Sequence, residues 1–495
     1  MDKKAKVIMV QGTMSNAGKS ILAAGLCRIF AKDGFKVAPF KSQNMALNSF
    51  VTKEGLEMGR AQVMQAECAG VEPLAIMNPI LLKPTSDVGS QVILNGKVLG
   101  NMKATEYFKR KPEFIPEIKA AFEQLSQMAD IIVVEGAGSP VEMNLKKDDI
   151  VNMGLAKLLD APVLLVGDID RGGIFPQLLG TLDLLEDDER ARVKGLIVNK
   201  FRGDSKLFED GVKILEERGG KKVVGVVPYM NVNLEDEDSL SERFYVNQAK
   251  DFDIAVVRLP HISNFTDFDT FEQMPFVSVR YVSSVRDFGN PNVIIIPGSK
   301  NTIEDLRWLK SSGLADKIIS EEGKGKVIFG ICGGYQMLGR KIEDPEGVEC
   351  GGCEDGLNLL PVETSLKGRK IRSEFTGIVE GATGVLQSLK GKNVEGYEIH
   401  MGVTTPVKDE SEGTGECPDL TPFTSNATGY SKGNVYGTYV HGFFDKKEIL
   451  ECVTGREVDS AKDFRDFKET QYDILEKGLR ESLDLKYIYE IMGIN

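Results

Sequence analysis

The amino-acid sequence predicts an α/β protein built from two domains, each with a parallel β-sheet covered by helices. Up to Val227, short apolar segments rich in β-branched side chains alternate with helical stretches, and the same alternation begins again near Asp251. Strands that are apolar throughout are typical of a parallel sheet with helices on both faces. A glycine-rich turn follows one strand in each half of the chain, so a functional loop is expected in both domains.

The first domain is expected to span residues 1–235. Its strands are expected at Lys6–Gln11, Val37–Phe40, Ile131–Glu135, Val163–Gly167, Leu196–Asn199 and Val223–Val227. Its clearest helical patterns are Gly18–Lys32, Ile150–Leu159 and Lys206–Arg218. The polar segment Asn231–Lys250, rich in Glu, Asp, Ser and Asn, then predicts a connection between domains.

The second domain is expected to span residues 251–446. Its strands are expected at Ile254–Leu259, Phe276–Arg280, Val293–Pro297 and Val327–Phe329. From Asp463 onward the apolar residues recur at helical spacing, which predicts a helical extension over residues 447–495. We expect these C-terminal helices to pack on the second domain.

Composition excludes several classes of protein. The chain has 495 residues, 41% of them apolar, and a net charge of −13, which argues against a nucleic-acid partner. No apolar stretch approaches the ~18 residues of a membrane span, and the first residues lack a signal-peptide core, so we expect a cytoplasmic protein. The seven cysteines are scattered, and Cys350 and Cys353 lack a matching pair, so no structural metal is expected. The oligomeric state stays open, with a homodimer as one option.

The first loop is a phosphate-binding candidate. It follows a strand, precedes a helix, and comprises Gly12, Thr13, Met14, Ser15, Asn16, Ala17, Gly18, Lys19 and Ser20. Backbone N–H groups of such a turn bind phosphate oxygens of ATP, while Lys19 reaches the β/γ-phosphates and Ser20 binds Mg²⁺. Thr13 stands where the usual spacing has glycine. The alternative is a glycine-rich turn that binds no ligand.

Carboxylates follow two strands that are expected to neighbour this loop. Glu135 ends a strand of continuous apolar residues and is the candidate second ligand of Mg²⁺. The alternative is a solvated acid at a strand end. Asp168 and Asp170 follow the next strand, where they either contact metal or substrate or cap the following helix.

The extended loop and the strand-end Glu135 resemble the dethiobiotin-synthetase family, whose members use ATP to phosphorylate a carboxylate. The resemblance implies that Asn199, after a late strand, lies near the adenine, with Arg202 close by. The rival is a partitioning-type ATPase. Such proteins carry an additional lysine early in the loop, where this chain has Met14.

The second glycine-rich turn carries a candidate thiol nucleophile. Cys332 lies in Gly330–Gln336, a Gly-x-Cys-x-Gly turn between a strand and a helix, which is the nucleophile-elbow arrangement. A thiol needs a base. His441 at a strand end is the preferred candidate, His400 is a rival base, a substrate contact or a residue of the domain interior, and His261 is expected to be structural. The alternative is a buried, inert thiol.

This turn resembles class I glutamine amidotransferases of flavodoxin-like fold. The resemblance implies that Cys332 and His441 release ammonia from glutamine, with backbone amides of Gly298, Ser299 and Gly333 as the oxyanion hole. Most members of that family place a glutamate two residues after the histidine, but this chain has Phe443 there. The third catalytic group is therefore open: either the site is a dyad, or another residue orients His441.

Longer blocks resemble the cobyric acid synthase family among the cobalamin-pathway amidotransferases. They are FKSQNMALNS (40–49), EGAGSPVEMNL (135–145), DIVNMG (149–154), GDIDRGGIF (167–175), ISNFTDFD (262–269) and GYEIHMG (396–402). Ser42 and Asn16 depart from otherwise matching blocks. The resemblance implies amidation of the b, d, e and g carboxylates of adenosylcobyrinic acid a,c-diamide, a corrinoid. ATP and Mg²⁺ would form an acyl phosphate, and glutamine would be the nitrogen donor.

Several assignments stay alternatives at this stage. Lys41, Gln43 and Asn44 are candidate nucleotide or corrinoid contacts, against a surface loop without ligand. The nearest rival function is cobyrinic acid a,c-diamide synthase, which amidates the a and c carboxylates. An amidotransferase acting on cell-wall precursor is disfavoured because its halves are usually separate chains. A non-catalytic ATP-switched scaffold is disfavoured by the intact Lys19, Cys332 and His441.

Overall fold

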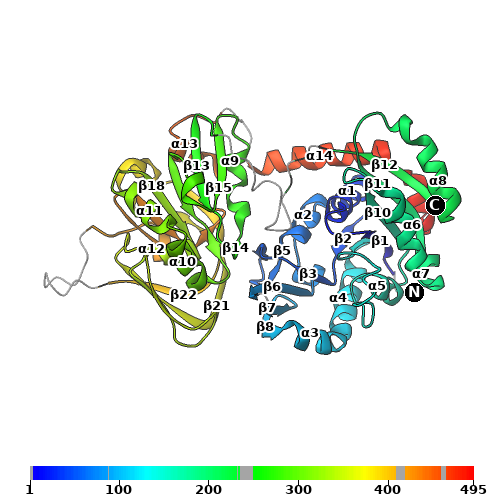
Figure 1. Cartoon of the computed structure of the whole chain (residues 1–495), viewed down its shortest axis with the longest axis horizontal. Helices are drawn as coiled ribbons and strands as arrows, with labels where there is room; N and C mark the ends of the chain where they lie inside the picture. Colours follow the sequence, from blue (N-terminus) through cyan, green and yellow to red (C-terminus); the bar gives the residue numbers. More distant parts are fainter. Residues whose placement is uncertain are drawn as a thin grey trace.

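The computed structural model describes residues 4–86, 89–230, 232, 234, 249–407, 419–458 and 464–494. Two α/β lobes lie side by side, and both ends of the chain lie in the first lobe (Figure 1). The predicted connection Asn231–Lys250 lies mostly outside the described residues. No helix in these ranges has both the length and the apolar character that a membrane span requires.

A six-stranded parallel sheet with the order β12-β11-β10-β1-β9-β2 forms the centre of the first lobe. Its strands are β1 (Lys6–Gly12), β2 (Val37–Phe40), β9 (Ile131–Glu135), β10 (Val163–Asp168), β11 (Val193–Phe201) and β12 (Lys222–Pro228). The predicted strands therefore exist, with ends that differ by at most three residues. Strands β1, β9 and β10 are almost wholly buried, which explains their continuous apolar sequence.

Helices cover both faces of this sheet and lie between the strands. They are α1 (Lys19–Lys32), α2 (Arg60–Cys68), α4 (Ile115–Met128), α5 (Met153–Leu159), α6 (Ile174–Leu184), α7 (Asp187–Arg192) and α8 (Glu209–Gly219), whereas α3 (Ala104–Arg110) contacts the strand Lys97–Lys103 outside this sheet. One hydrophobic cluster lies on each face. Helix α1 begins directly after the phosphate loop, so its N-terminal N–H groups face that loop.

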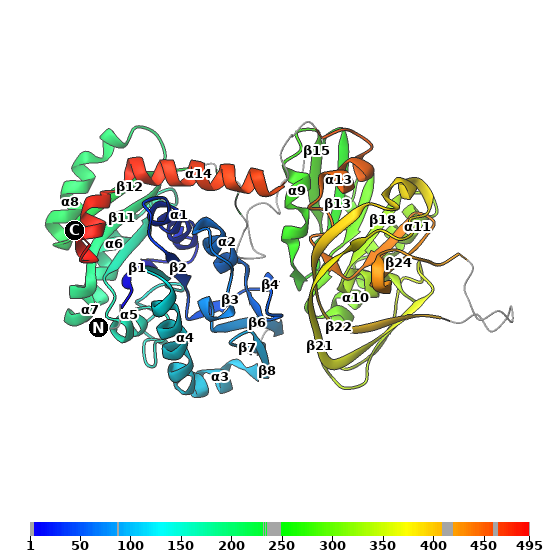
Figure 2. The same cartoon turned by 180° about the vertical axis from the view of Figure 1, so that it is seen from behind.

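A smaller sheet, which the sequence did not predict, is inserted after β2. Its order is β3-β6-β7-β8, and its strands are β3 (Gln43–Met45), β6 (Ile80–Ser86), β7 (Gly89–Leu94) and β8 (Lys97–Lys103). A two-stranded ribbon, β4 (Ser49–Val51) with β5 (Glu57–Gly59), lies beside it. Figure 2 shows this insertion on the side of the first lobe that faces the second lobe.

The second lobe contains a seven-stranded sheet with the order β15-β13-β16-β18-β25-β24-β23. The strands are β13 (Phe252–Val257), β15 (Val277–Val282), β16 (Val293–Ile296), β18 (Val327–Ile331), β23 (Thr421–Pro422), β24 (Gly429–Lys432) and β25 (Val435–Thr438). The first five in spatial order are parallel, as the sequence predicts. Helices α9 (Asp269–Glu272), α10 (Thr302–Ser311), α11 (Leu314–Glu322), α12 (Gly333–Leu338) and α13 (Lys447–Thr454) complete this layer.

A second, five-stranded sheet in this lobe has the order β20-β19-β21-β22-β26. Its strands are β19 (Lys341–Asp344), β20 (Gly352–Asp355), β21 (Val362–Ile378), β22 (Asn393–Pro406) and β26 (Val440–His441). The long antiparallel pair β21–β22 places His400 opposite Ile371, and β22 also pairs with the strand that carries His441. A two-stranded pair, β14 (Ile262–Ser263) with β17 (Gly298–Ser299), lies near the end of β18.

The C-terminal helices correct one prediction. Helices α14 (Phe464–Ser482) and α15 (Leu485–Ile491) pack on the first domain and not on the second (Figure 1). Tyr472, Leu475 and Leu479 of α14 join the hydrophobic cluster of α1, and a Cβ added to Gly25 would lie 2.1 Å from Leu479 Cδ1. The helical pattern shows that one face is apolar, but it does not show which surface that face covers.

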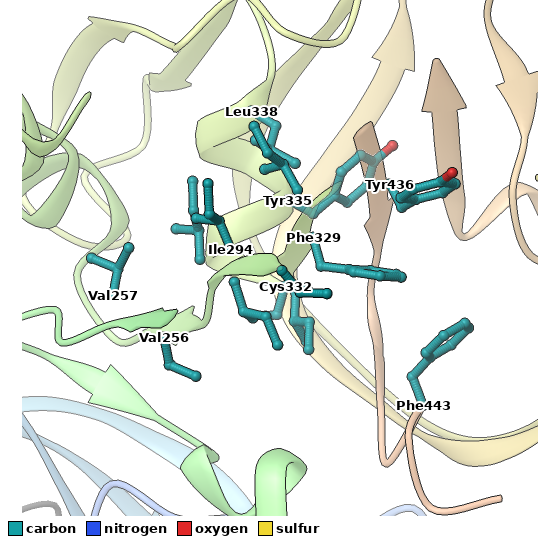
Figure 3. Packing of buried hydrophobic residues seen from close by; sticks show 14 of the residues in the cluster. Val256, Val257, Ile294, Phe329, Cys332, Tyr335, Leu338, Tyr436 and Phe443 are labelled. Atoms are coloured by element: carbon teal, nitrogen blue, oxygen red, sulfur yellow. The ribbon is translucent and has the colours of Figure 1, made fainter. Parts of the chain in front are cut away.

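The core of the second lobe surrounds the candidate nucleophile. Figure 3 shows Cys332 beside Phe329 and Ile294 and below Tyr335, among side chains of the parallel strands and of α12. These residues belong to one buried hydrophobic cluster. The turn that carries the thiol is therefore fixed between a packed strand and a packed helix.

Candidate active sites

Cys332 adopts the strained turn that the sequence predicts. Its φ of 52° and ψ of −109° lie outside the regions that non-glycine residues favour, and it directly follows β18 and precedes α12. A Cβ on Gly334 would lie 1.9 Å from the carbonyl oxygen of Ile296. Glycine is therefore required there for the turn to pack against the neighbouring strand end. The Cys332 Sγ lies 3.7 Å from the carbonyl oxygen of Ile399.

A carboxylate that the sequence left unassigned orients His441. Asp267 Oδ2 accepts a hydrogen bond of 2.7 Å from His441 Nδ1, and its Oδ1 accepts one of 3.0 Å from the Gly442 backbone N–H. Asp267 lies on a short 3₁₀ turn, Phe265–Phe268, within the block ISNFTDFD. The two side chains are buried. Phe443, at the position where a glutamate was expected, packs instead in the aromatic core against Phe329.

The charge of Asp267 changes the acidity of the imidazole. Burial lowers the pKa of His441, but the negative charge of Asp267 and hydrogen bonds to Asp267 and Cys332 outweigh this effect and raise the pKa to about 10. A histidine in this environment retains a proton that it takes from the thiol. The arrangement of thiol, imidazole and carboxylate can therefore form a thiolate–imidazolium pair.

The residues predicted for the oxyanion hole are adjacent. Gly298 and Ser299 form β17, and a Cβ placed on Gly333 would lie 2.9 Å from the backbone nitrogen of Ser299. The Ser299 hydroxyl donates to Asp305 Oδ2 at 2.6 Å, which fixes this loop. The close approach places the backbone N–H groups of both loops beside the thiol turn, where they can stabilise an oxyanion.

Ser49 of the first lobe bonds to two second-lobe residues, Asn264 and Tyr397, that contact the His441 imidazole. Asn264 Nδ2 lies 3.2 Å from His441 Nε2, and the backbone N–H of Ser49, in β4, donates to Asn264 Oδ1 at 3.2 Å. Tyr397 stacks on the imidazole with ring centroids 5.3 Å apart and donates its hydroxyl to the Ser49 carbonyl oxygen. Strand β4 therefore lies directly against the residues that hold the imidazole.

The other two histidines lie elsewhere in this lobe. His400 stacks on Tyr439 with ring centroids 3.6 Å apart, and its Nδ1 lies 2.8 Å from the carbonyl oxygen of Gly402. Burial lowers the pKa of His400 to about 4. His261 Nδ1 contacts Asp305 Oδ1 at 2.8 Å. The pKa of His441 is thus raised, whereas His400 is neutral at physiological pH.

The thiol opens into a pocket with an empty volume of about 490 Å³. Residues of the second lobe form most of its wall, and one residue of the first lobe, Lys83, completes it. The lining residues are Lys83, Ser263, Asn264, Ser299, Lys300, Thr302, Cys332, Gln336, Glu349, Leu366, Lys370, Ile399, His400, Met401 and His441. Such a polar pocket beside a thiol suits a small polar substrate.

The first lobe carries the phosphate loop. Asn16 and Gly18 have positive φ values of 60° and 96°, which turn the backbone N–H groups between β1 and α1. The remaining predicted loop residues, Gly12, Thr13, Ser15 and Ala17, lie in the same turn. Lys19 is buried, and its Nζ donates to the carbonyl oxygens of Met14 and Gly138 at 3.0 and 3.2 Å. The Lys19 side chain thus lies across the loop. A nucleotide phosphate bound there would accept hydrogen bonds from the same ammonium group.

Glu135 is the centre of a buried polar cluster beside this loop. Its Oε1 accepts hydrogen bonds of 2.8 Å from both Ser20 Oγ and Lys41 Nζ, and its Oε2 accepts one of 2.6 Å from Gln65 Nε2. A hydroxyl and a carboxylate oxygen are ligands that Mg²⁺ prefers. The ammonium group of Lys41 pairs with Glu135 Oε1 in this structure, so Mg²⁺ would compete with Lys41 for that oxygen.

Asn199 lies near the end of β11, and Arg202 directly follows this strand, at the same edge of the sheet. Asn199 Nδ2 donates to the Ala17 carbonyl oxygen at 2.9 Å, so it braces the phosphate loop. Arg202 pairs with Asp170 at 2.5 Å and lies 3.7 Å above the ring of Tyr229. This half-exposed stack lies beyond the loop, where a flat adenine ring could lie.

The remaining predicted contacts lie around this edge. Asp168 is buried and accepts from Lys200 Nζ at 2.9 Å, and Lys200 also donates to the Asn16 carbonyl oxygen. Gln43 Oε1 accepts a hydrogen bond from the Tyr107 hydroxyl at 2.5 Å. Asn44 is buried and donates to Gln62 Oε1 at 3.1 Å. Within the described chain, Gln43 and Asn44 therefore bond to the inserted segment itself.

Sequence reasoning missed several residues of these sites, among them Asp267, Gln65 and Lys200. Gln65 lies on α2, and no motif marks it. Lys200 lies between Asn199 and Arg202, which the sequence had singled out, and Asp267 lies within the block ISNFTDFD. Those positions were the available signal, but a block alone does not show which of its residues faces the partner.

Comparisons with known proteins agree with this division of the chain. Residues 8–240 match the CobQ/CobB/MinD/ParA nucleotide binding domain, and residues 253–449 match the CobB/CobQ-like glutamine amidotransferase domain. Cobyric acid synthase of Lachnoclostridium phytofermentans is 54% identical over 508 residues, which cover 99% of each chain.

Two further relatives carry the same name. Cobyric acid synthase of Ruminiclostridium cellulolyticum is 54% identical and covers 99% of this chain and 97% of its own. Cobyric acid synthase of Caldanaerobacter subterraneus subsp. tengcongensis is 49% identical and covers 98% of each chain. With both domain types present in order and relatives aligned over nearly the full length, the chain belongs to the cobyric acid synthase family.

Proposed function

We propose that this protein amidates the b, d, e and g carboxylates of adenosylcobyrinic acid a,c-diamide to give adenosylcobyric acid, with ATP as activator and glutamine as nitrogen donor. One observation supports the proposal above all: a single chain carries a phosphate loop with Lys19 and a thiol elbow whose imidazole is held by a carboxylate. In this assignment residues 1–235 activate the carboxylate, and residues 251–446 release the ammonia.

The activation step uses the phosphate loop. A carboxylate is a poor acceptor for ammonia because it is anionic and would have to expel oxide. Transfer of the γ-phosphoryl group of ATP to a carboxylate oxygen gives an acyl phosphate and ADP, and Lys19 stabilises the charge that spreads over the transferred group. Ser20 and Glu135 would hold Mg²⁺, which would neutralise phosphate charge.

The ammonia-releasing step uses the Cys332 site. The Cys332 thiolate, whose proton is already on His441, attacks the side-chain amide carbon of glutamine, and the backbone amides near Ser299 and Gly333 stabilise the oxyanion. His441 then returns the proton to the leaving ammonia, and Asp267 holds the ring in the orientation that both transfers need. Water hydrolyses the thioester to glutamate and restores the thiol.

The two steps meet when ammonia attacks the acyl phosphate. The carbon–nitrogen bond forms, the bond to phosphate breaks, and the proton that ammonia loses passes to the departing inorganic phosphate, so each amide formed consumes one ATP and one glutamine. Because ammonia is mostly protonated in neutral water, direct transfer between the lobes favours the reaction. The contact of Ser49 with Asn264 shows how closely the two lobes approach near the thiol site.

Mass spectrometry tests this function. The protein is incubated with adenosylcobyrinic acid a,c-diamide, MgATP and glutamine labelled with ¹⁵N at the side-chain amide. We expect a ladder of products that ends at four labelled amides. Labelled amides on cobyrinic acid instead would assign the protein to a,c-diamide synthesis, and ATP and glutamine turnover without a labelled corrinoid would show a different acceptor.

A further inference from the structure

Three lysines converge on the thiol pocket. Lys83 of β6 comes from the first lobe, Lys300 directly follows the oxyanion residue Ser299, and Lys370 comes from β21. The side chains of Lys83 and Lys370 are 4% and 7% exposed. Amide hydrolysis at Cys332 needs no lysine, so the catalytic residues do not explain this cluster.

First-lobe residues hold these lysines in place. Glu57 of β5 is completely buried and pairs with Lys83 Nζ through Oε1, at 2.9 Å, and with Lys370 Nζ through Oε2. Gln91 of β7 offers its Oε1 to Lys300 Nζ at 2.9 Å and to Lys370 Nζ at 3.4 Å. Lys300 and Lys370 belong to the second lobe, but their partners Glu57 and Gln91 belong to the first.

The pocket carries more positive than negative charge. Within the described residues, Glu57 is the one carboxylate that pairs with these lysines, and Lys300 has only the neutral Gln91 oxygen as a side-chain acceptor. The pocket wall itself holds a single carboxylate in the described chain, Glu349, which accepts hydrogen bonds from the Thr302 backbone N–H and hydroxyl. A buried ammonium group without a counterion is unfavourable, so an anion is expected to complete the cluster.

The pKa shifts of Lys300, Lys370 and Glu349 agree with a pocket that binds a charged ligand. Burial and the charge of Lys83 lower the pKa of Lys300 to about 8. Burial, with repulsion from Lys300 and Lys83, lowers the pKa of Lys370 well below its usual value, although Glu57 opposes this. Burial raises the pKa of Glu349 to about 7, although Lys300 opposes this. A zwitterion with one carboxylate and one ammonium group would stabilise the charged forms of all three residues.

We propose that Lys300 and Lys370 bind the α-carboxylate of glutamine, that Glu349 binds its α-ammonium group, and that Glu57 and Gln91 of the first domain position the two lysines. This inference rests on the proposed glutaminase role of Cys332. The glutamine site is then shared between the domains: the second domain supplies the contacts, and the first domain holds them in position. Lys300 adjoins Ser299, so the lysine and the oxyanion hole bind opposite ends of one short substrate.

Glutamine analogues test this assignment on the unmodified full-length protein. 4-Aminobutanamide lacks the α-carboxylate, and glutaramate lacks the α-ammonium group, while both keep the reacting amide. We expect kcat/KM for ammonia release to fall on the order of 100-fold or more with each analogue, because each leaves buried charges unpaired. If 4-aminobutanamide reacts as well as glutamine, the lysine assignment is wrong.

Variants show which residue binds the α-carboxylate of glutamine and which binds its α-ammonium group. In Lys300→Gln, kcat/KM for glutamine should fall on the order of 100-fold, mainly through KM, and the preference for glutamine over 4-aminobutanamide should nearly vanish. The preference for glutamine over glutaramate should be retained in Lys300→Gln and lost in Glu349→Gln. In Gln91→Leu, KM for glutamine should rise more than kcat falls, although Gln91 does not line the pocket. The exposed Lys390→Gln is the matched control, with unchanged constants.

Corrinoid amidation with ammonium chloride in place of glutamine separates the two proposals. Variants with intact folds should keep this activity at the level of the unmodified protein, since ammonium bypasses the pocket. Loss of analogue discrimination together with normal ammonium-dependent amidation supports the glutamine site. Normal glutamine KM in Lys300→Gln overturns it but leaves the proposed function standing, whereas no corrinoid amidation with either nitrogen source in the unmodified protein overturns the proposed function alone.

Discussion

Asp267 determines how His441 works, although 174 residues separate them in the chain. Its carboxylate bonds both to the imidazole Nδ1 and to the next backbone N–H, so it fixes the ring and the strand end together. We expect Asp267→Asn to lower glutamine hydrolysis on the order of 10³-fold, because the amide can hold the wrong tautomer. Amidation with ammonium chloride should be unchanged, and a comparable loss there would contradict the assigned role.

The same substitution predicts a change in pH dependence. The imidazolium of the thiolate–imidazolium pair loses its proton as the pH rises through the His441 pKa of about 10, so glutamine hydrolysis should fall above that pH. Without the negative charge of Asp267 the pKa falls, and the alkaline limb of the profile should move to lower pH in Asp267→Asn. A limb that stays in place would mean that Asp267 does not set this pKa.

For single residues, the sequence marks the candidate nucleophile Cys332 more clearly than it marks Asp267, which orients the imidazole. The glycines on both sides of Cys332 are a local signature of the elbow, because the turn leaves no room for other side chains at Gly334. Asp267 has no such signature. Its role depends on how a 3₁₀ turn before α9 meets a strand end near the far end of the domain, which is a property of the tertiary structure.

Among the elements, α14 joins the end of the chain to its beginning. Leu475 is fully buried in the cluster of α1, whereas the adjacent Ile474 is 48% exposed. Leu475→Ala should therefore destabilise the first domain by about 2–5 kcal/mol. Ile474→Ala, the matched control, should change stability by less than about 0.5 kcal/mol.

Two probes of urea unfolding can locate this effect. The single tryptophan, Trp308, lies on α10 of the second lobe, so its fluorescence reports that lobe, while circular dichroism reports both. Leu475→Ala should lower the circular dichroism midpoint more than the fluorescence midpoint. A larger shift in fluorescence would contradict the packing of α14 on the first domain.

The elements also show what periodicity can predict. Strands such as β2 and β9 begin and end at the predicted residues because a buried parallel strand is apolar throughout. The inserted sheet β3-β6-β7-β8 was not predicted. Its strands are partly polar, and Lys83 and Gln91 take part in contacts between the lobes that no local pattern reveals.

For the whole molecule, Glu57 links the two lobes. It pairs with Lys83 of its own lobe and with Lys370 of the other, and Arg372 of the second lobe also donates to the Gly96 carbonyl oxygen of the first. Glu57→Gln leaves two buried ammonium groups without their counterion and should weaken the contact between lobes by about 3–5 kcal/mol. The exposed Glu54→Gln is the control.

In Glu57→Gln, we expect the two lobes to unfold at different urea concentrations. In Glu57→Gln the fluorescence and circular dichroism transitions in urea should move apart, because each lobe then unfolds more independently. Coincident transitions with unchanged midpoints would contradict a structural role for Glu57. This contact could not be predicted from the sequence, since a buried lysine and an exposed lysine look alike until the lobes are placed together.

The central claim is that one chain holds two separate sites and that ammonia passes from one to the other. The most direct test measures corrinoid amidation by two variants, each with two nitrogen sources. Cys332→Ala should amidate the corrinoid with ammonium chloride but not with glutamine. Lys19→Met should amidate with neither, yet still release glutamate from glutamine. Glutamine-dependent amidation by Cys332→Ala, or corrinoid amidation by Lys19→Met, would contradict the account.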